Sequence, residues 1–344
     1  MRRFNVVLQT ANAALVSLFV LQAMASGAVS LDFDFAIGTE GSGPGQFRHP
    51  VGVAFDASGR ILVTDDNNNR IEAFDSQGNF LSMFGGVGGS GNGEFKNPQG
   101  IAIDLVTGNI VIGDLNNHRI QIFSSSGTFL STFGSLGSGN GQFNHPHGIA
   151  ITASGNIVVS DDHDRVQIFS SSGTYLSSFG SSGSGIGQLL GPSALAIGPG
   201  GDIYVADTGN YQIDVFDPTG NFIRAFGSIG NGAGQFGGGS PASPYGPRGI
   251  AVDSAGNVFV SDTINSRIEV FDSNGNYVTE ADGFHSPQML AVDTNGNVAV
   301  ADYGNNRVVV LNYVPEPSTF TLFSFALLAI GGHRFVQRRQ RRTE

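Results

Sequence analysis

An Asp and an Arg that recur together are the residues of this chain with the most obvious capacity for chemistry. The five pairs are Asp65/Arg70, Asp114/Arg119, Asp161/Arg165, Asp262/Arg267 and Asp302/Arg307. One such pair could transfer a proton or bind an anion. Their repetition favours a structural role instead, in which each Arg folds back on the Asp and on loop carbonyls, because a catalytic centre needs an asymmetry that a shared pair does not. We therefore assign no catalytic residue among them.

A second set of candidates consists of the residues that follow a recurring Pro. These residues are Val51, Gln99, His147, Ser193, Arg248 and Gln288. If the copies surround an axis, this set lies at the mouth of a central channel. His147 raises the hypothesis of a metal site, because imidazole is a common zinc ligand, and His49, His145 and His285 are close to it in the pattern. No Asp or Glu is expected beside His147, so the sequence predicts no metal site and no cofactor.

The fourth copy departs from the others, and function is expected where the copies differ. Tyr211 and Gln212 replace a small or polar residue and the Arg. The connection over residues 227–247, which contains Tyr245, is the longest, and the next one, over 279–287, is the shortest. This uneven rim suits a ligand groove, with a drifting surface loop as the alternative explanation. The predicted ligand-binding residues are His147, Arg248, Gln99, Gln288, Tyr211 and Tyr245.

These candidates belong to a repeated unit of four short strands. A Gly stands six residues before each repeated Asp, and successive Asp residues are 49, 47, 46, 55 and 40 residues apart. In the first copy, strands are predicted over residues 51–55, 61–64, 71–74 and 80–84, separated by turns that begin with Asp and end with Gly. Four antiparallel strands in about 45 residues are typical of a propeller blade. The sequence therefore predicts an all-β, six-bladed β-propeller.

The last copy lacks its fourth strand, because it ends at Leu311. The stretch 31–37 stands before Gly45-Gln46-Phe47 just as the outer strand 80–84 stands before Gly93-Glu94-Phe95. We expect this N-terminal strand to pair into the last blade, which closes the ring and removes the open sheet edge.

The pattern G-N-hydrophobic followed by D-x-x-N-x-R-I-x-hydrophobic-F resembles the NHL repeat over residues 31–313, and the resemblance implies six blades. Two enzyme families share this shape. Peptidylglycine-amidating lyases rely on several channel-facing His with Tyr and Arg, and lactonase-type propellers need Glu, Asn and Asp around a cation. The residues predicted at the channel mouth match neither set, and the chain has no G-x-S-x-G, H-E-x-x-H or P-loop motif.

The N-terminus differs in kind from the repeats. Arg2 and Arg3 precede an apolar run over residues 13–21, and Ala23-Met24-Ala25 follows as a small-x-small cleavage pattern. This order predicts a signal peptide over residues 1–28, with a buried N-terminal helix as the alternative.

The C-terminus carries a second targeting pattern. Val314-Pro315-Glu316-Pro317-Ser318 precedes an apolar run over 320–332 and an Arg cluster over 334–342. This order resembles the PEP-CTERM sorting signal of Gram-negative bacteria. For residues 314–344, the resemblance implies recognition by an exosortase-type processing enzyme, transient anchoring through the C-terminal helix at the inner membrane, and then transfer to the cell surface or outside. An ordinary membrane anchor is the alternative.

The middle of the chain is acidic. The ends carry seven of the 17 Lys and Arg and two of the 28 Asp and Glu, which leaves residues 26–314 with a net charge of −16. A nucleic-acid partner needs a basic stripe and is excluded. The chain has no Cys, which excludes disulfides and thiol chemistry.

The sequence therefore predicts an exported propeller over residues 29–313 that binds a protein or polysaccharide partner at the cell surface or in the extracellular matrix. The alternative is a metal-dependent lyase or hydrolase with its site at the channel mouth.

Overall fold

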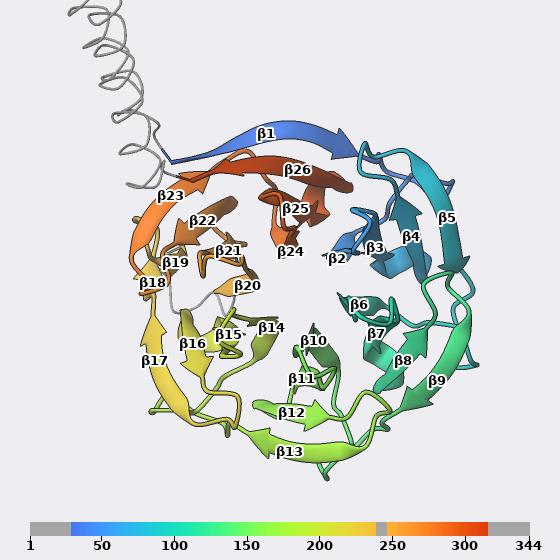
Figure 1. The fold of residues 1–344 in the computed structure, drawn as a ribbon, viewed down its shortest axis with the longest axis horizontal. Helices are drawn as coiled ribbons and strands as arrows, with labels where there is room; N and C mark the ends of the chain where they lie inside the picture. Colours follow the sequence, from blue (N-terminus) through green and yellow to red (C-terminus); the bar gives the residue numbers. More distant parts are fainter. Residues whose placement is uncertain (1–28, 239–245, 316–344) are drawn as a thin grey trace, which may run out of the picture. The chain divides into compact units, whose positions relative to one another are not determined.

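A computed structural model describes residues 29–238 and 246–315, and these residues form a ring of β-sheets around a central channel (Figure 1). In this part of the chain the strands make six four-stranded sheets and one two-stranded sheet. Neighbouring strands of these blades pair antiparallel, as where Pro50–Phe55 pairs with Ile61–Asp65. The prediction of an all-β, six-bladed propeller with four-stranded blades is confirmed.

Each blade contributes one strand to each of four concentric positions. The innermost strands are β2 (Pro50–Phe55), β6 (Pro98–Ile103), β10 (Pro146–Ile151), β14 (Pro192–Ile197), β20 (Pro247–Val252) and β24 (Pro287–Val292). The second strands are β3 (Ile61–Asp65), β7 (Ile110–Asp114), β11 (Ile157–Asp161), β15 (Ile203–Asp207), β21 (Val258–Asp262) and β25 (Asn297–Asp302). The third strands are β4 (Arg70–Phe74), β8 (Arg119–Phe123), β12 (Arg165–Phe169), β16 (Gln212–Phe216), β22 (Arg267–Phe271) and β26 (Arg307–Val314). The outermost strands are β5 (Phe80–Gly85), β9 (Phe129–Phe133), β13 (Tyr175–Phe179), β17 (Phe222–Phe226), β23 (Tyr277–Ala281) and β1 (Ser30–Ile37).

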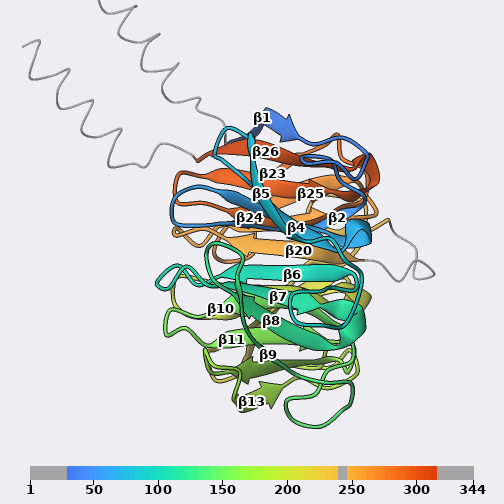
Figure 2. The ribbon, with the colours of Figure 1, turned by 90° about the vertical axis from the view of Figure 1, so that its right-hand side faces the viewer.

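Short elements connect these strands. A single-turn 3-10 helix follows the second strand in four blades: η1 (Asp66–Asn68), η2 (Leu115–Asn117), η3 (Thr208–Asn210) and η4 (Tyr303–Asn305). The two-stranded sheet, β18 (Ile229–Gly230) with β19 (Phe236–Gly237), is parallel and belongs to the connection into the fifth blade. Figure 2 shows the 3-10 turns along one side of the ring, so the loops after the second strands share one face.

The N-terminal strand closes the ring, as predicted. The sixth blade has the strand order β24, β25, β26, β1, so strands from the two ends of the propeller lie side by side in it (Figure 1). Strand β26 continues to Val314, which the sequence had placed at the start of the C-terminal segment. Since closure gives β26 a partner along its outer edge, the ring has no break between its first and last blades.

The core lies mainly between neighbouring blades. One buried cluster joins Ile71 and Ala73 of the first blade to Ile110 and Ile112 of the second, and similar clusters join the other blades. Aromatic rings pack across these contacts: the ring centroids of Phe84 and of Phe123 in the next blade are 4.9 Å apart. Near the axis the blades approach so closely that a Cβ at Gly52 would lie 2.1 Å from a carbonyl oxygen of the next blade.

The Asp–Arg pairs are structural, as the repetition predicted. In the second blade, Arg119 Nε donates to Asp114 Oδ2 at 2.8 Å. The Arg119 guanidinium also donates to three carbonyl oxygens of the Gly-rich connection that enters the blade, those of Ser90, Gly91 and Glu94. Asp114 Oδ1 accepts the main-chain N–H of Lys96. We call this arrangement of Asp, Arg and loop carbonyls the staple.

A second interaction links four of the six loops to the next blade. The residue that ends the turn after the second strand is left-handed, with φ of 54° at Asn69, and its side chain accepts a main-chain N–H just before the next inner strand. The pairs are Asn69 with Asn97, His118 with His145, Asp164 with Gly191, and Asn306 with His49. These side chains therefore hold successive blades in register on the face that carries the 3-10 turns.

Several predicted features lie outside the described residues: the signal peptide over 1–28, Tyr245, and the C-terminal segment from Glu316 onward. Within residues 29–238 and 246–315, no helix is long and apolar enough to cross a membrane.

The staple predicts that two arginines contribute differently to the free energy of unfolding. Arg119→Ala should lower the free energy of unfolding by about 3 kcal/mol, because the buried Asp114 carboxylate loses its counter-charge. Arg60→Ala, which removes a partly exposed ion pair with Asp56, should cost less than about 1 kcal/mol. Urea unfolding of both variants measures the difference, and equal losses would contradict the structural role assigned to the staple.

Candidate functional site

A pocket of about 640 Å³ opens on the face that carries the 3-10 turns, since residues of η3 line it. It is lined by the starts of three inner strands and by two of the turns that follow second strands. Its lining residues are His147, Asp162, Leu190, Gly191, Pro192, Ser193, Thr208, Gly209, Tyr211 and Arg248. Three of the predicted ligand-binding residues, from the third, fourth and fifth blades, thus meet in one depression.

His147 is held by a carboxylate that the sequence did not predict. Its Nε2 lies 2.8 Å from Asp162 Oδ1, and its Nδ1 lies 3.2 Å from Gln99 Oε1. His145 Nδ1 lies 3.0 Å from the other oxygen, Asp162 Oδ2. The expectation that no acidic residue accompanies His147 is therefore wrong. Partial burial raises the pKa of Asp162, but the hydrogen bonds and charges of His147 and His145 outweigh burial and hold the pKa below its ordinary value.

A shortened turn brings Asp162 to this position. In the third blade the Arg follows the repeated Asp by four residues, where the other Asp–Arg pairs are five residues apart. The left-handed residue is accordingly Asp164, one residue earlier in the unit than Asn69 or His118. The main-chain N–H of Asp162 donates to Asn144 at the entry of the same blade. The shorter turn keeps Asp162 against the two histidines.

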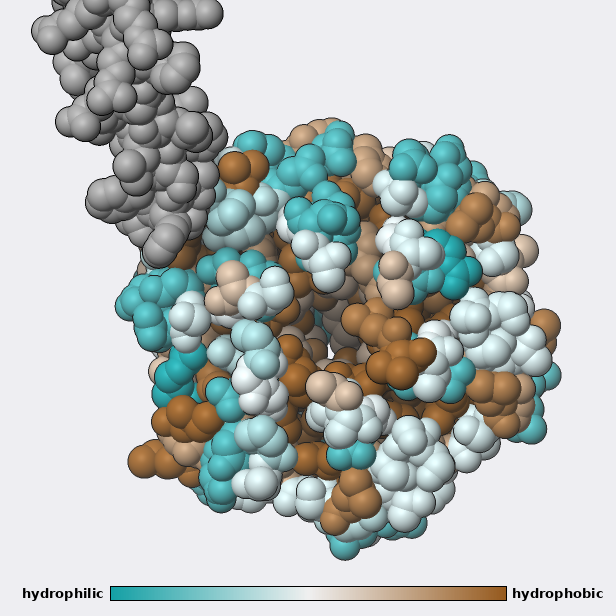
Figure 3. Space-filling view, viewed as in Figure 1, coloured by the Kyte–Doolittle hydropathy of each residue, from teal (hydrophilic) through white to brown (hydrophobic). Residues whose placement is uncertain are grey.

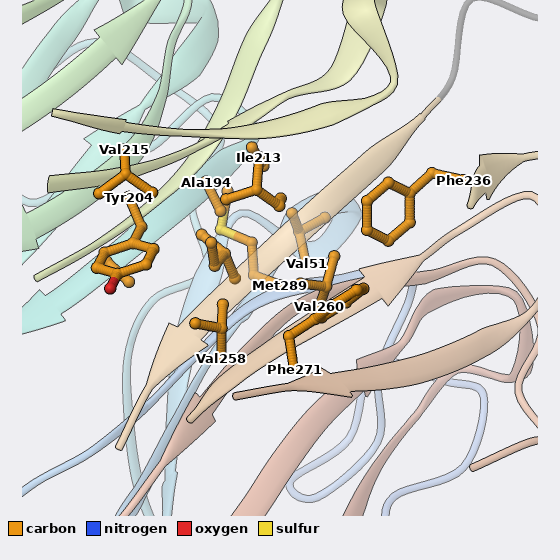
Figure 4. Close-up of a cluster of buried hydrophobic side chains, with 13 residues drawn as sticks. Val51, Ala194, Tyr204, Ile213, Val215, Phe236, Val258, Val260, Phe271 and Met289 are labelled. Carbon is orange, nitrogen blue, oxygen red and sulfur yellow. The ribbon is translucent and has the colours of Figure 1, made fainter. Parts of the chain in front are cut away.

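The other predicted residues take different places. Arg248 Nη1 donates to Gln288 Oε1 at 3.0 Å, so Gln288 and Gln99 contact pocket residues without lining the pocket themselves. Val51, expected at the channel mouth, is instead buried in an apolar cluster with Met289 (Figure 4), because its apolar side chain gains from leaving water. Of the residues predicted at the channel mouth, His147, Ser193 and Arg248 line the pocket, whereas Val51 belongs to the apolar core.

Tyr211 occupies the left-handed position of the fourth blade, with φ of 58°. In the first, second, third and sixth blades this position holds an Asn, His or Asp whose side chain accepts the next blade's N–H, and in the fifth blade it holds Ser266. Here the N–H of Gly246 donates instead to the main-chain oxygen of Thr208. The Tyr211 side chain does not take part in that link to the next blade, and it lines the pocket.

Sequence reasoning missed the position that follows each repeated Asp. Its occupants are Asp66, Leu115, Asp162, Thr208, Thr263 and Tyr303. Burial raises the pKa of Asp66 to about 6, against hydrogen bonds from Asn97 and Gln99. Tyr303 stacks on His49 with ring centroids 4.3 Å apart. The signal was present: this position varies among copies while the Asp before it does not.

The opposite end of the channel has another character. Figure 3 views that face and shows apolar surface around the central opening. A cavity of about 230 Å³ there is lined almost wholly by apolar residues of the six inner strands, including Phe55, Ile103 and Ile197. Groups able to bind a polar ligand are therefore concentrated at the other end, where the pocket offers a guanidinium, an imidazole–carboxylate pair, a phenol and a hydroxyl. Within the described ranges, no three His, Asp or Glu side chains are grouped as a metal site.

Comparison with known families and proteins agrees with the repeat. The model of the NHL repeat matches residues 47–74, 95–123, 189–216, 245–271 and 284–311. The chain is an NHL-repeat propeller with six blades. The third blade lies outside the matched ranges, and it is the blade with the shortened turn.

The relatives of this NHL propeller are similar over short stretches or in fold alone. Protein lin-41 of Caenorhabditis elegans is 49% identical over 45 residues, 13% of this chain and 4% of that protein. Protein brain tumor of Drosophila melanogaster is 50% identical over 44 residues, again 13% and 4%. The chain thus spans a small fraction of the length of these relatives, about one blade.

Two solved structures illustrate the shared fold. A gluconolactonase from Xanthomonas campestris is 16% identical, with a TM-score of 0.59 over 84% of this chain and 98% of that one. A catalytically inactive virginiamycin B lyase from Staphylococcus aureus is 15% identical, with a TM-score of 0.54 over 84% and 89%.

Two buried carboxyl groups away from the pocket also have displaced pKa values. Burial raises the pKa of Glu72 to about 7, against the charge of Arg70. Burial likewise raises the pKa of Glu269 to about 7, against a main-chain hydrogen bond and Arg267. The same position is Gln121 in the second blade and Gln167 in the third, so a neutral side chain is compatible with the staple.

This predicts how stability depends on pH. A raised pKa means that the folded state keeps a proton that the unfolded chain releases, so each Glu stabilises fully below pH about 4.5 and loses that contribution as pH rises to about 7. The variant Glu72→Gln/Glu269→Gln should therefore lose less stability than the parent between pH 5 and 8, by roughly 2–3 kcal/mol per site. Urea unfolding at both pH values tests this, with Glu94→Gln on the exposed connection as control; parallel pH profiles for parent and double variant would refute it.

Proposed function

We propose that this chain is an exported, non-enzymatic binding propeller that holds a protein or polysaccharide partner at the cell surface or in the extracellular matrix. The partner binds on the face that carries the 3-10 turns. One observation carries the proposal: the pocket there is built from positions at which the copies differ, whereas the repeated charged residues are engaged in staples. His147, Tyr211 and Arg248 converge on it from three blades.

The two ends of the chain support export. The signal-peptide pattern over residues 1–28 and the PEP-CTERM-like segment over 314–344 flank the propeller, which suits a precursor that is anchored through its C-terminal helix and then processed by an exosortase-type enzyme. The net charge of −16 over residues 26–314 keeps such a domain soluble and disfavours nucleic acid.

The pocket's role is testable by substitution. In the full chain, Arg248→Ala and Tyr211→Ala should each weaken binding to a glycan array or to purified cell-surface protein at least tenfold, on the order of 1.4 kcal/mol. Val106→Ala, at a residue that is 88% exposed in the turn after inner strand β6, is the matched control. If all three variants bind as the parent does, the pocket is not the binding site.

The enzymatic alternative makes a different prediction about metal. A metal-dependent lyase or hydrolase at the channel mouth would carry a stoichiometric divalent ion that His147→Ala removes. We expect His147→Ala to leave the metal content of the purified full chain unchanged. Loss of a bound ion together with loss of a measured turnover would replace the binding proposal by the enzymatic one.

The sorting segment can be examined separately. Glu316→Ala/Pro317→Ala should retain the chain in the membrane fraction, because the motif that the processing enzyme recognises is removed while the apolar run remains. Gln337→Ala, beyond that run, serves as control. Equal release of the parent and the double variant into the medium would contradict the proposed processing.

A further inference from the structure

The staple has the same hydrogen-bond pattern in the first, second, third and fifth blades. In each, the guanidinium donates to three carbonyl oxygens at equivalent points of the entering connection. Arg70 donates to the carbonyls of Ser42, Gly43 and Gln46, and Arg119 donates to those of Ser90, Gly91 and Glu94. Arg165 donates to the carbonyls of Ser138, Gly139 and Gln142, and Arg267 donates to those of Asn231, Gly232 and Gln235. A positive charge and several donors thus satisfy a cradle of oxygen atoms.

The fourth blade keeps the cradle but lacks the Arg. Its connection has the same internal hydrogen bonds, with Gly183 N to Leu189 O and Gln188 N to Gly185 O both at 3.0 Å. The third blade has the equivalent bonds at 3.1 Å, from Gly137 N and Gln142 N. Because the two connections are equivalent, the carbonyls of Ser184, Gly185 and Gln188 face the space that the guanidinium of Arg165 occupies in the third blade. Among the described residues, no side chain donates to these three oxygens.

The fourth blade also has two acidic residues at this point but no Arg, whereas the first and fifth blades place an Arg beside the equivalent two acids. Asp207 is the repeated acid, and Asp214 stands where the second and third blades have a neutral Gln. Asp214 is 1% exposed. Burial and then the charge of Asp207 raise the pKa of Asp214 well above its ordinary value, and a side-chain hydrogen bond joins the two carboxyl groups. Two buried carboxyl groups in contact must share a proton or bind a cation that replaces it.

Gln212 replaces the Arg only in part. Its Nε2 donates to Asp214 Oδ1 at 2.9 Å, which leaves the three loop carbonyls without a side-chain donor among the described residues. Gln is neutral, so it supplies no counter-charge. Because its side chain occupies part of the space of the guanidinium, what remains suits a compact ion better than a planar one.

We propose that the fourth blade binds a divalent cation of the calcium type in the place of the missing guanidinium. Its ligands are carboxylate oxygens of Asp207 and Asp214 and the carbonyl oxygens of Ser184, Gly185 and Gln188. Calcium takes six to eight oxygen ligands in irregular arrangements, including carboxylates, main-chain carbonyls and water, whereas magnesium demands a near-ideal octahedron. No imidazole or thiolate belongs to this set, which disfavours zinc and copper.

The position of this ion gives it a consequence for the pocket. Asp207 Oδ1 accepts the main-chain N–H of Leu190 at 2.7 Å, and Leu190 lines the pocket. A cation on Asp207 therefore stabilises the turn and the connection that form one pocket wall. The ion itself lies at the staple, away from His147, so it is distinct from a metal at the channel mouth.

Thermal unfolding of the full chain, freed of metal with EGTA and titrated with CaCl2, tests the proposal. Extracellular calcium modules have dissociation constants of about 0.1–1 mM, and a tenfold excess over the dissociation constant should raise Tm by about 3 °C. Gln212→Arg should raise the Tm of the metal-free protein and abolish the calcium response, since it restores the guanidinium. Asp214→Asn should also abolish the response.

The matched control is Gln121→Asp in the second blade, which adds the equivalent carboxylate while Arg119 stays in place; its calcium response should equal that of the parent. No response of the parent to 10 mM calcium, roughly tenfold above the weakest expected dissociation constant, would overturn the proposal. A calcium response that survives both Gln212→Arg and Asp214→Asn would also overturn the proposal, because the ion would then bind elsewhere.

An equal response to MgCl2 would overturn the assignment to calcium. Failure of the pocket variants to affect partner binding leaves these outcomes unchanged, so the two proposals fail separately.

Discussion

The buried Asp at the end of each second strand is the interaction on which the rest of the ring depends. In the second blade its two carboxylate oxygens accept from a main-chain N–H of the entering connection, from Asn117 and from Arg119. The connection is rich in Gly and contributes few apolar side chains, so it has little core of its own. A charged acceptor that binds several donors at once can hold such a segment, because charge-assisted hydrogen bonds are stronger than neutral ones. The blade and its entry loop thereby become one unit.

This arrangement explains where the chain can vary. The Asp, the Asn and the Arg of the unit are engaged with one another, and the left-handed residue is engaged with the next blade. The positions left for recognition are the residue after the inner-strand Pro and the residue after the Asp. The two blades that depart most from the unit, the third with its shortened turn and the fourth with Tyr211 and Gln212, are neighbours. The pocket is lined by residues of both of these blades, so it lies where the repetition is weakest.

Much of the fold could be predicted from the sequence because the information is local. Alternating apolar runs, turns such as 56–59, and a fixed Gly-to-Asp spacing determine the strands, and the missing outer strand determines closure by Ser30–Ile37. Convergence of His147 and Arg248 on one end of the channel also followed from their shared place after a Pro. Asp162 could not be found in this way, since its position depends on how a turn one residue shorter redirects the chain. The burial of Val51 was missed for a similar reason: equivalence in the repeat does not determine which side chains a neighbouring blade covers.

The acidity of the propeller constrains what the pocket can select. Long-range attraction from a surface of net negative charge favours neutral or basic partners, but screening limits this effect to about 8 Å at physiological ionic strength. Inside the pocket the nearest formal charges are those of Arg248 and of the Asp162 carboxylate with its two histidines. A ligand that reaches it therefore meets one cationic and one compensated acidic group across an apolar floor of Leu190 and Pro192. Such a site discriminates by where a ligand carries its polar groups, and not by its overall charge. On the proposed binding function, we expect a partner that has a weakly charged surface and a hydrogen-bond acceptor for Arg248.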